Sequence, residues 1–191
     1  MTITGLTIVN EAIQLIGNNQ PAVTGSPPTF DSSPAGVAAA ALYQSVVNTV
    51  ARQANWDWTR QTVTLTASGN TPPLPFTYEY LYPANAVQVW QVIPASLSDA
   101  NNPLPITWQV ANTMVGGNQT KVVQTNQASA SAVVATVLTN SEPLWDPLFR
   151  QAVVRLLASE MAMACEARPD TAREMLETSV QFAQVGATRD S

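Results

Sequence analysis

The 191-residue chain contains no histidine, one cysteine and one lysine. The lack of histidine removes Ser-His and Cys-His nucleophile pairs, the commonest general base and the commonest metal ligand, so most familiar hydrolase mechanisms are excluded. Because Cys165 is the single cysteine, the chain can form neither an internal disulfide nor a cysteine-rich zinc site. This cysteine usage suits a reducing cytoplasm.

Charge is also scarce. Charged residues make up 11% of the chain, against about 25% in typical globular proteins. Because 46% of the residues are hydrophobic, the low charge argues against disorder. No stretch approaches the roughly 20 consecutive apolar residues that span a membrane, and residues 1–6 lack the pattern of a secretory signal. A net charge of −5 without a basic cluster is typical of proteins that do not grip DNA phosphates.

Helical spacing marks the N-terminal part of the chain. Apolar residues recur every three or four positions over residues 6–16, and Gly17 is placed to end this helix. A loop rich in Pro, Gly and Ser follows from Gln20 to Ser33. Ser33-Pro34 then supplies an N-cap and a first-turn residue, which predicts a second helix over residues 34–55.

Two further helices are predicted near the C-terminus. Asp146-Pro147 starts the first, and Arg168-Pro169 ends it. Asp170 is then expected to cap a final helix that carries apolar residues through Ala183. Residues 186–191 are predicted to form a short polar tail.

Between the helical ends the hydrophobic period changes to two, which is typical of strands. Strands separated by Pro, Gly, Asn and Asp clusters are predicted at 62–67, 77–82, 86–93, 106–110, 121–125 and 132–138. The turn at Gly116-Gly117 is expected to close a hairpin, since glycine readily takes positive φ angles. The pattern predicts an antiparallel β unit.

These elements predict an α+β fold class. The N- and C-terminal helix pairs are expected to join into one four-helix bundle, with the antiparallel β unit inserted between them. The predicted domains are a discontinuous helical bundle, residues 1–56 and 142–191, and an inserted β domain, residues 57–141.

The charge deficit lies in the β segment. Residues 61–141 carry three charged residues, Glu79, Asp99 and Lys121, whereas residues 142–191 carry eight acidic residues and five arginines. Exposed strands are normally protected by charged side chains. Two interpretations of the uncharged β unit follow. Neighbouring subunits cover its surface, or it is a polar, Thr-rich sandwich that is exposed to solvent. The composition does not decide between them. We take Trp90 and Trp108 as candidate subunit or tail contacts, because aromatics concentrate at interface hot spots, and we add Lys121 as a third candidate contact.

No catalytic motif is complete. The segment from Gly116 to Lys121 lacks the glycine before the lysine and the Ser or Thr after it that a phosphate loop requires. A serine activated by Lys121, or a carboxylate pair of Asp57 and Glu79, is chemically possible, but no spacing supports either. Cys165 lies in an apolar helical pattern and is expected to be buried. We predict no enzyme activity, no metal and no cofactor.

The order of features resembles the tail tubular protein A family, the head-to-tail adaptors of short-tailed bacteriophages. The helical pair between Pro147 and Phe182 fits this layout, and the shorter matching segments are Asn10–Gly17, Ala41–Tyr43, Arg52, Trp56–Trp58, Tyr80–Ala84 and Val87–Val89.

The resemblance implies a virion structural protein, assembled in the host cytoplasm and located in the neck or tail. Adaptors of this kind form a dodecameric ring beneath the portal protein, extend the channel for double-stranded DNA during genome ejection, and offer a platform to the tail nozzle or tail tube. By resemblance, Gly186, Arg189, Asp190 and Ser191 are the expected portal contacts. An acidic chain suits a conduit that should not hold its DNA.

Two other hypotheses stay open. The chain could be another neck or tail-completion protein, from a long-tailed phage, which its partner would distinguish. It could instead be a small hydrolase or a ligand- or carbohydrate-binding module that uses the polar β face. That hypothesis predicts monomers and a ligand-dependent shift of the melting temperature.

Overall fold

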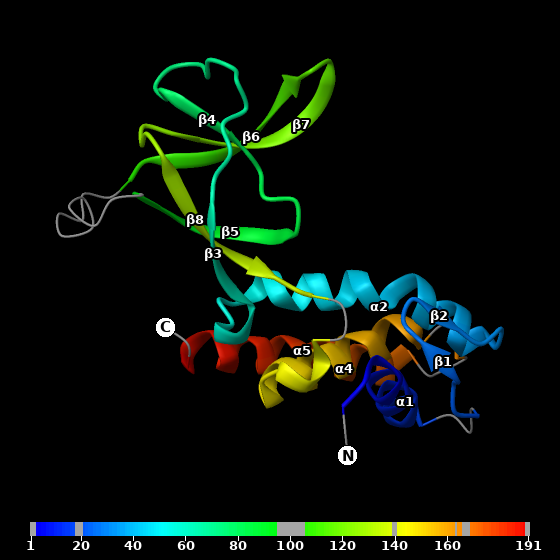
Figure 1. Ribbon diagram of the computed structural model, residues 1–191. Helices are drawn as coiled ribbons and strands as arrows, with labels where there is room; N and C mark the ends of the chain where they lie inside the picture. Colours follow the sequence, from blue (N-terminus) through cyan, green and yellow to red (C-terminus); the bar gives the residue numbers. More distant parts are fainter. Residues whose placement is uncertain are drawn as a thin grey trace. The chain divides into compact units, whose positions relative to one another are not determined.

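The computed structural model describes residues 3–17, 21–94, 106–138, 141–162, 164–165 and 169–189. The chain divides into two compact units (Figure 1). Residues 1–59 and 137–191 form the first, here called the helical unit, and residues 60–136 form the second, here called the β unit.

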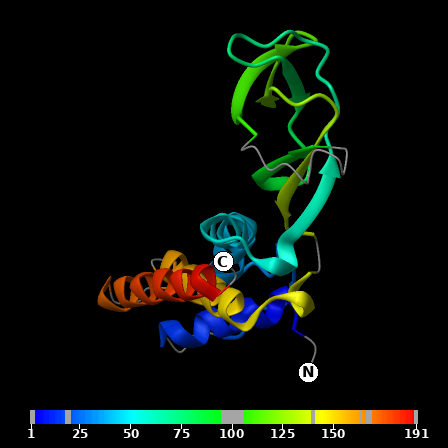
Figure 2. The ribbon, with the colours of Figure 1, turned by 90° about the vertical axis from the view of Figure 1, so that its left-hand side faces the viewer.

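The helical unit is organised around one central helix. Its four described α-helices are α1 (Gly5–Ile16), α2 (Pro34–Gln53), α4 (Pro147–Met161) and α5 (Pro169–Arg189). Helices α1, α2 and α5 all pack against α4 (Figure 2). Because eight side chains of α4 are buried, this helix supplies contacts to all three neighbours at once.

Local sequence signals set most of the helix ends. The side chains of Ser33 and Asp146 cap α2 and α4 by accepting hydrogen bonds from the backbone N–H groups of Gly36 and Leu148. Gly17 ends α1 in the left-handed conformation, with φ of 72°. These three predicted boundaries are confirmed.

Two predictions for the last helix are wrong. Helix α5 begins at Pro169, so Asp170 lies in its first turn rather than at the N-cap. Proline suits the first helical position because its missing N–H has no helical partner there. The helix also continues to Arg189, so most of the predicted polar tail is helical. Gly186 makes this possible, since its missing side chain lets α5 approach the indole ring of Trp56 closely.

The predicted loop between α1 and α2 contains a small hairpin of β1 (Gly25–Ser26) and β2 (Thr29–Phe30). The side chain of Asn10 anchors the chain before β1, because its amide accepts from the N–H of Val23 at 2.8 Å and donates to the Val23 carbonyl at 3.1 Å. Asp31 follows β2 and accepts hydrogen bonds from Ser33 and Thr24, and these bonds lower its pKa to about 2.

Aromatic rings fill the interior of the helical unit. Phe149 lies 4.8 to 5.2 Å from the rings of Trp56, Trp58 and Trp145 in edge-to-face contacts. Trp56 is fully buried and donates its indole N–H to the carbonyl of Val50 at 3.0 Å. The cluster joins the end of α2 to the start of α4.

The β unit contains two three-stranded antiparallel sheets. One has the order β3-β8-β5, made of β3 (Arg60–Thr64), β8 (Ala130–Thr136) and β5 (Ala86–Pro94). The other has the order β4-β7-β6, made of β4 (Tyr78–Leu81), β7 (Asn118–Thr125) and β6 (Trp108–Val115).

The chain that follows β3 links the two sheets. The N–H of Leu65 donates to the carbonyl of Ala130 at 3.0 Å, on the side of β8. The carbonyl of Thr66 accepts from the N–H of Leu81 in β4 at 2.8 Å, on the opposite side. This segment therefore bonds first to β8 and then to β4, while β3 and β5 are the end strands of one sheet and β4 and β6 the end strands of the other. Both sheets contribute to one core, whose buried residues are Leu65, Tyr80, Val89, Val92, Val123, Ala130, Ala132 and Val134.

The predicted fold class, a four-helix bundle with an inserted antiparallel β unit, is wrong. The described residues form four α-helices and eight strands in three antiparallel sheets. Three helices surround α4 instead of sharing a bundle core, because α4 buries side chains toward each of them. The hairpin β1-β2 was predicted as loop, and the strands predicted at 106–110 and 121–125 were too short.

Candidate interaction surface

The hairpin of β6 and β7 is the longest regular feature of the β unit. Its register runs from Val115 opposite Asn118 to Trp108 opposite Thr125 without a bulge. Gly116 and Gly117 form the two-residue turn with φ angles of 56° and 85°. Because this turn needs positive φ at both positions, two glycines fix the hairpin and its register. The predicted hairpin turn is confirmed.

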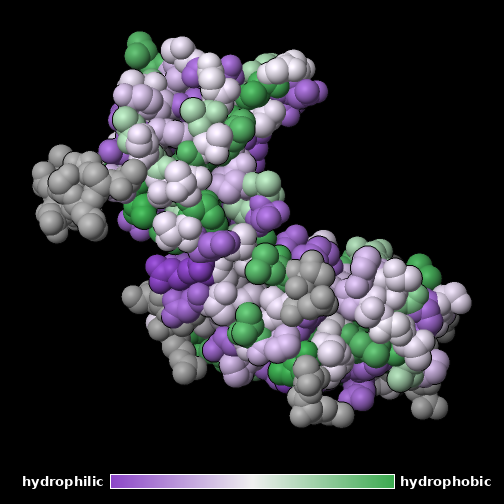
Figure 3. All heavy atoms as spheres, in the orientation of Figure 1, coloured by the Kyte–Doolittle hydropathy of each residue, from purple (hydrophilic) through white to green (hydrophobic). Residues whose placement is uncertain are grey.

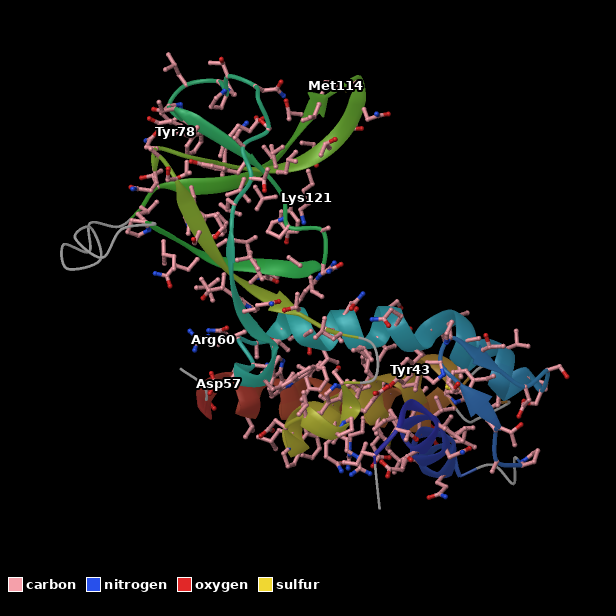
Figure 4. The ribbon with its side chains drawn as sticks, viewed as in Figure 1. Tyr43, Asp57, Arg60, Tyr78, Met114 and Lys121 are labelled. Carbon is pink, nitrogen blue, oxygen red and sulfur yellow. The ribbon has the colours of Figure 1, made fainter. Side chains whose placement is uncertain are left out.

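Apolar side chains are exposed along this sheet. Met114 is 59% exposed, and Val110 and Tyr78 are each 40% exposed. Tyr78 belongs to β4 and Met114 to β6, the two end strands of the sheet β4-β7-β6 (Figure 4). On the face of the β unit seen in Figure 3, apolar side chains lie interspersed among polar ones.

A buried polar network removes the charge of Glu79 from this surface. Glu79 is 4% exposed. One of its carboxylate oxygens accepts hydrogen bonds from the Ser68 hydroxyl at 2.8 Å and the Asn70 amide at 3.2 Å. The other accepts from the Gln124 amide at 2.8 Å, and Gln124 accepts in turn from Gln109 at 2.8 Å. Buried carboxylates are tolerated where hydrogen bonds satisfy them, so Glu79 serves to hold β4, β7, β6 and the chain after β3 together.

Lys121 lies on β7, and its ammonium nitrogen is 3.8 Å from the centre of the Tyr82 ring. This distance is typical of a cation-π contact. With Glu79 buried, the exposed charged residues in the described part of the β unit are Arg60 and Lys121. The surface is therefore nearly uncharged, as the composition of the segment indicates.

Each of the two candidate tryptophans lies on an end strand of one of the two sheets. Trp108 is half-buried at the start of β6 and packs against the core of the unit. Trp90 is half-buried in β5, and its indole N–H is buried without a hydrogen-bond partner among the described residues. Nothing in the structure tests their predicted contacts with a subunit or tail protein.

Two of the four expected portal contacts, Gly186 and Arg189, lie in α5. Gly186 is buried against Trp56. Arg189 is the last residue of α5. Asp190 and Ser191 fall outside the described residues.

The two carboxylates considered as a catalytic pair, Asp57 and Glu79, belong to different units of the chain. Asp57 starts a short 3-10 helix, η1 (Asp57–Thr59), in the helical unit, whereas Glu79 is buried in the β unit. Cys165 is 1% exposed, as predicted, and burial raises the pKa of its thiol. Among the described residues, no three His, Cys, Asp or Glu side chains gather where they could hold a metal ion.

A buried pair that the sequence does not reveal joins Tyr43 of α2 to Glu142. Glu142 begins a second 3-10 helix, η2 (Glu142–Leu144), and accepts a hydrogen bond from the Tyr43 hydroxyl at 2.9 Å. Burial, and then the nearby charge of Glu142, raise the pKa of Tyr43 far above its usual range. The pair ties α2 to the segment that leads into α4.

No protein-family model matches the chain, and no curated protein sequence does either. Each helix in the described ranges falls short of the length or the hydrophobicity that a bilayer crossing requires.

Proposed function

We propose that the protein is a virion structural protein, a head-to-tail adaptor that forms a ring between the portal and the tail nozzle or tail tube of a bacteriophage. The proposal begins from the sequence resemblance to the tail tubular protein A family. The observation that supports it best is the nearly uncharged surface of the β unit, where Glu79 is buried and Arg60 and Lys121 are the exposed charges described.

Such a surface suits subunits that cover one another. The cores of protein interfaces are depleted of charged residues, and sheets exposed to solvent normally carry charges along their edges. Here the exposed positions of β6 are apolar or neutral, including Val110, Asn112 and Met114. A stable neighbour on this side of the β unit would bury them without removing charges from water.

The proposed role needs no catalysis and no cofactor. The portal protein and the tail protein are the partners, and double-stranded DNA passes through the ring lumen without specific binding. With eight Lys and Arg residues against thirteen Asp and Glu residues, the protein has no excess of cations to hold DNA phosphates, so its passage is not slowed by tight binding. The protein would be located in the neck or tail of the virion, after assembly in the host cytoplasm.

Sedimentation velocity of the purified chain, alone and mixed with its cognate portal protein, tests the proposal. We expect a large species that contains both proteins in the mixture. Reversal of the charge at the predicted portal contact, Arg189→Glu, should lower the amount of this large species. The matched control is Arg173→Glu, which makes the same charge change at an exposed position near the other end of α5.

A chain that stays separate from the portal contradicts the proposal. If it then binds another neck or tail protein, it is a component of a different tail position. If it stays monomeric and a carbohydrate raises its melting temperature, it is a ligand-binding module.

A further inference from the structure

The outer edge of β6 is a regular edge that no other described strand of the β unit covers. In an antiparallel pair, successive residues point their backbone N–H and C=O groups alternately toward the partner strand and away from it. On β7, the carbonyls of Lys121 and Thr125 accept bonds from the side of β4, from the N–H groups of Tyr82 and Thr77. Their partners in the register on β6, Asn112 and Trp108, therefore direct their backbone groups away from β7.

The same alternation assigns Val110, midway between Asn112 and Trp108, to the outer edge. Within the described chain, the six backbone N–H and C=O groups of these three residues have no hydrogen-bond partner. The backbone groups of Met114, two residues further along β6, also point away from β7. Its carbonyl already accepts a hydrogen bond from the Asn70 amide at 2.9 Å. The open edge is thus a stretch of five residues centred on Val110.

Nothing in this stretch resists pairing with another strand. Natural edge strands are usually protected by lysine, proline or bulges, and residues 108–112 contain none of these. The end strand β5 of the other sheet is different. Its pairing with β8 is broken by two register shifts, and it ends at Pro94. A regular partner strand therefore fits β6 and not β5.

We propose that two copies of the chain pair through the outer edges of their β6 strands, antiparallel, with the two Val110 residues opposite each other. This register also places Trp108 opposite Asn112 of the second copy, and Asn112 opposite its Trp108. All six outward groups of each strand then find partners in six backbone hydrogen bonds.

The side chains favour a second copy as the occupant. Val110 is 40% exposed and lies beside Val123 of β7, so the pairing forms a row of four valines across two copies. The stretch is uncharged, so two identical edges meet without repulsion. The bond to Asn70 at Met114 stays intact, because Met114 lies beyond the paired residues.

This contact goes beyond the proposed function. It is isologous and closes with two copies, whereas the subunits of a cyclic ring contact one another through different surfaces. The pair therefore belongs to the free protein before assembly.

Disulfide cross-linking tests the register. In Val110→Cys the two thiol-bearing residues face each other as a hydrogen-bonded pair, with Cα atoms about 5.5 Å apart, within the range that a disulfide bridges. The control is Met114→Cys, a more exposed position on the same strand. In the proposed register its two copies lie roughly 27 Å apart, eight residues out of step. The native Cys165 is buried, so the unmodified protein gives the background.

We expect Val110→Cys to form the disulfide dimer on the order of tenfold faster than Met114→Cys, because paired thiols have a high effective concentration. Equal rates for the two variants, or slower cross-linking of Val110→Cys, overturn the proposal.

Sedimentation equilibrium of Val110→Lys and Met114→Lys gives a second, independent readout. The first should dissociate the dimer, and the second should leave it in place. Far-UV circular dichroism identifies any variant that fails to fold. If Val110→Lys dissociates the dimer yet still binds the portal protein, the result supports both the edge contact and the proposed function and shows that portal binding does not require the dimer. A dimer that survives Val110→Lys overturns the proposed register.

Discussion

Replacement of Gly186 by alanine sets two effects against each other. At an ordinary position inside a helix, alanine is more stable than glycine by about 1 kcal/mol. At position 186, however, the added Cβ would lie 2.1 Å from Cη2 and 2.3 Å from Cζ3 of Trp56. Carbon atoms pack best at about 3.5–4.0 Å, so the ring or the helix would have to move by more than an ångström.

The surroundings of Trp56 oppose such a movement. The ring is fully buried, its N–H donates to the carbonyl of Val50 at 3.0 Å, and its centre lies 5.2 Å from that of Phe149. Overpacking costs about 1–3 kcal/mol and loss of the hydrogen bond about 1 kcal/mol. After the gain in helix propensity is subtracted, Gly186→Ala should lower the free energy of unfolding by roughly 1–3 kcal/mol.

Urea unfolding followed by circular dichroism at 222 nm measures this change. The control is Gln184→Ala, an exposed position in the same helix, which should have little effect. In the double variant with Trp56→Phe, the smaller ring should relieve part of the clash, so that the two changes together cost less than their sum. If Gly186→Ala stabilises the protein, α5 does not pack against Trp56 as described.

Three further outcomes are expected from equilibrium unfolding. Glu79→Leu should lower the free energy of unfolding by on the order of 3 kcal/mol, because the buried donors lose their acceptor. Glu79→Gln keeps an acceptor oxygen and should lower it less. An unchanged stability of Glu79→Leu would refute the role of the network. The pKa of Asp31 is lowered to about 2, chiefly by the Ser33 hydroxyl, so its stabilising effect is complete above about pH 4 and is lost as the pH falls to about 2. The stability difference between the native protein and Asp31→Asn should therefore shrink over that interval, and a difference independent of pH would contradict this. Trp90→Phe should cost at least about 1 kcal/mol less than Trp56→Phe, because the Trp90 N–H has no partner to lose among the described residues; equal costs would contradict it.

The helix boundaries were predictable where a single residue sets them. Ser33, Asp146 and Gly17 act on their own neighbours in the chain, so their effect is visible in sequence. The hairpin turn at Gly116-Gly117 was predictable for the same reason.

Features that depend on distant contacts were not predictable. The helical end of α5 requires Gly186 to meet Trp56, 130 positions earlier in the chain. The full length of β6 and β7 was missed because their polar outer halves pair through the backbone and show no hydrophobic alternation.

The same limit applies to the candidate surface. Its neutral composition is visible in the sequence, but the burial of Glu79 depends on Ser68, Asn70 and Gln124, which lie up to 45 residues away. No spacing rule predicts such a network. Its trace in the sequence is the carboxylate of Glu79, which is the one charged residue in the segment 61–98. The open edge of β6 likewise becomes visible only with the strand order.

A ring that joins portal to tail has a defined stoichiometry, which the mass of its complex with the cognate portal protein reveals. Native mass spectrometry of the mixture gives the number of adaptor chains for each portal subunit. We expect a closed complex with one adaptor chain for each portal subunit. Portal rings that carry no adaptor chains, with the adaptor remaining free at every mixing ratio, would contradict it.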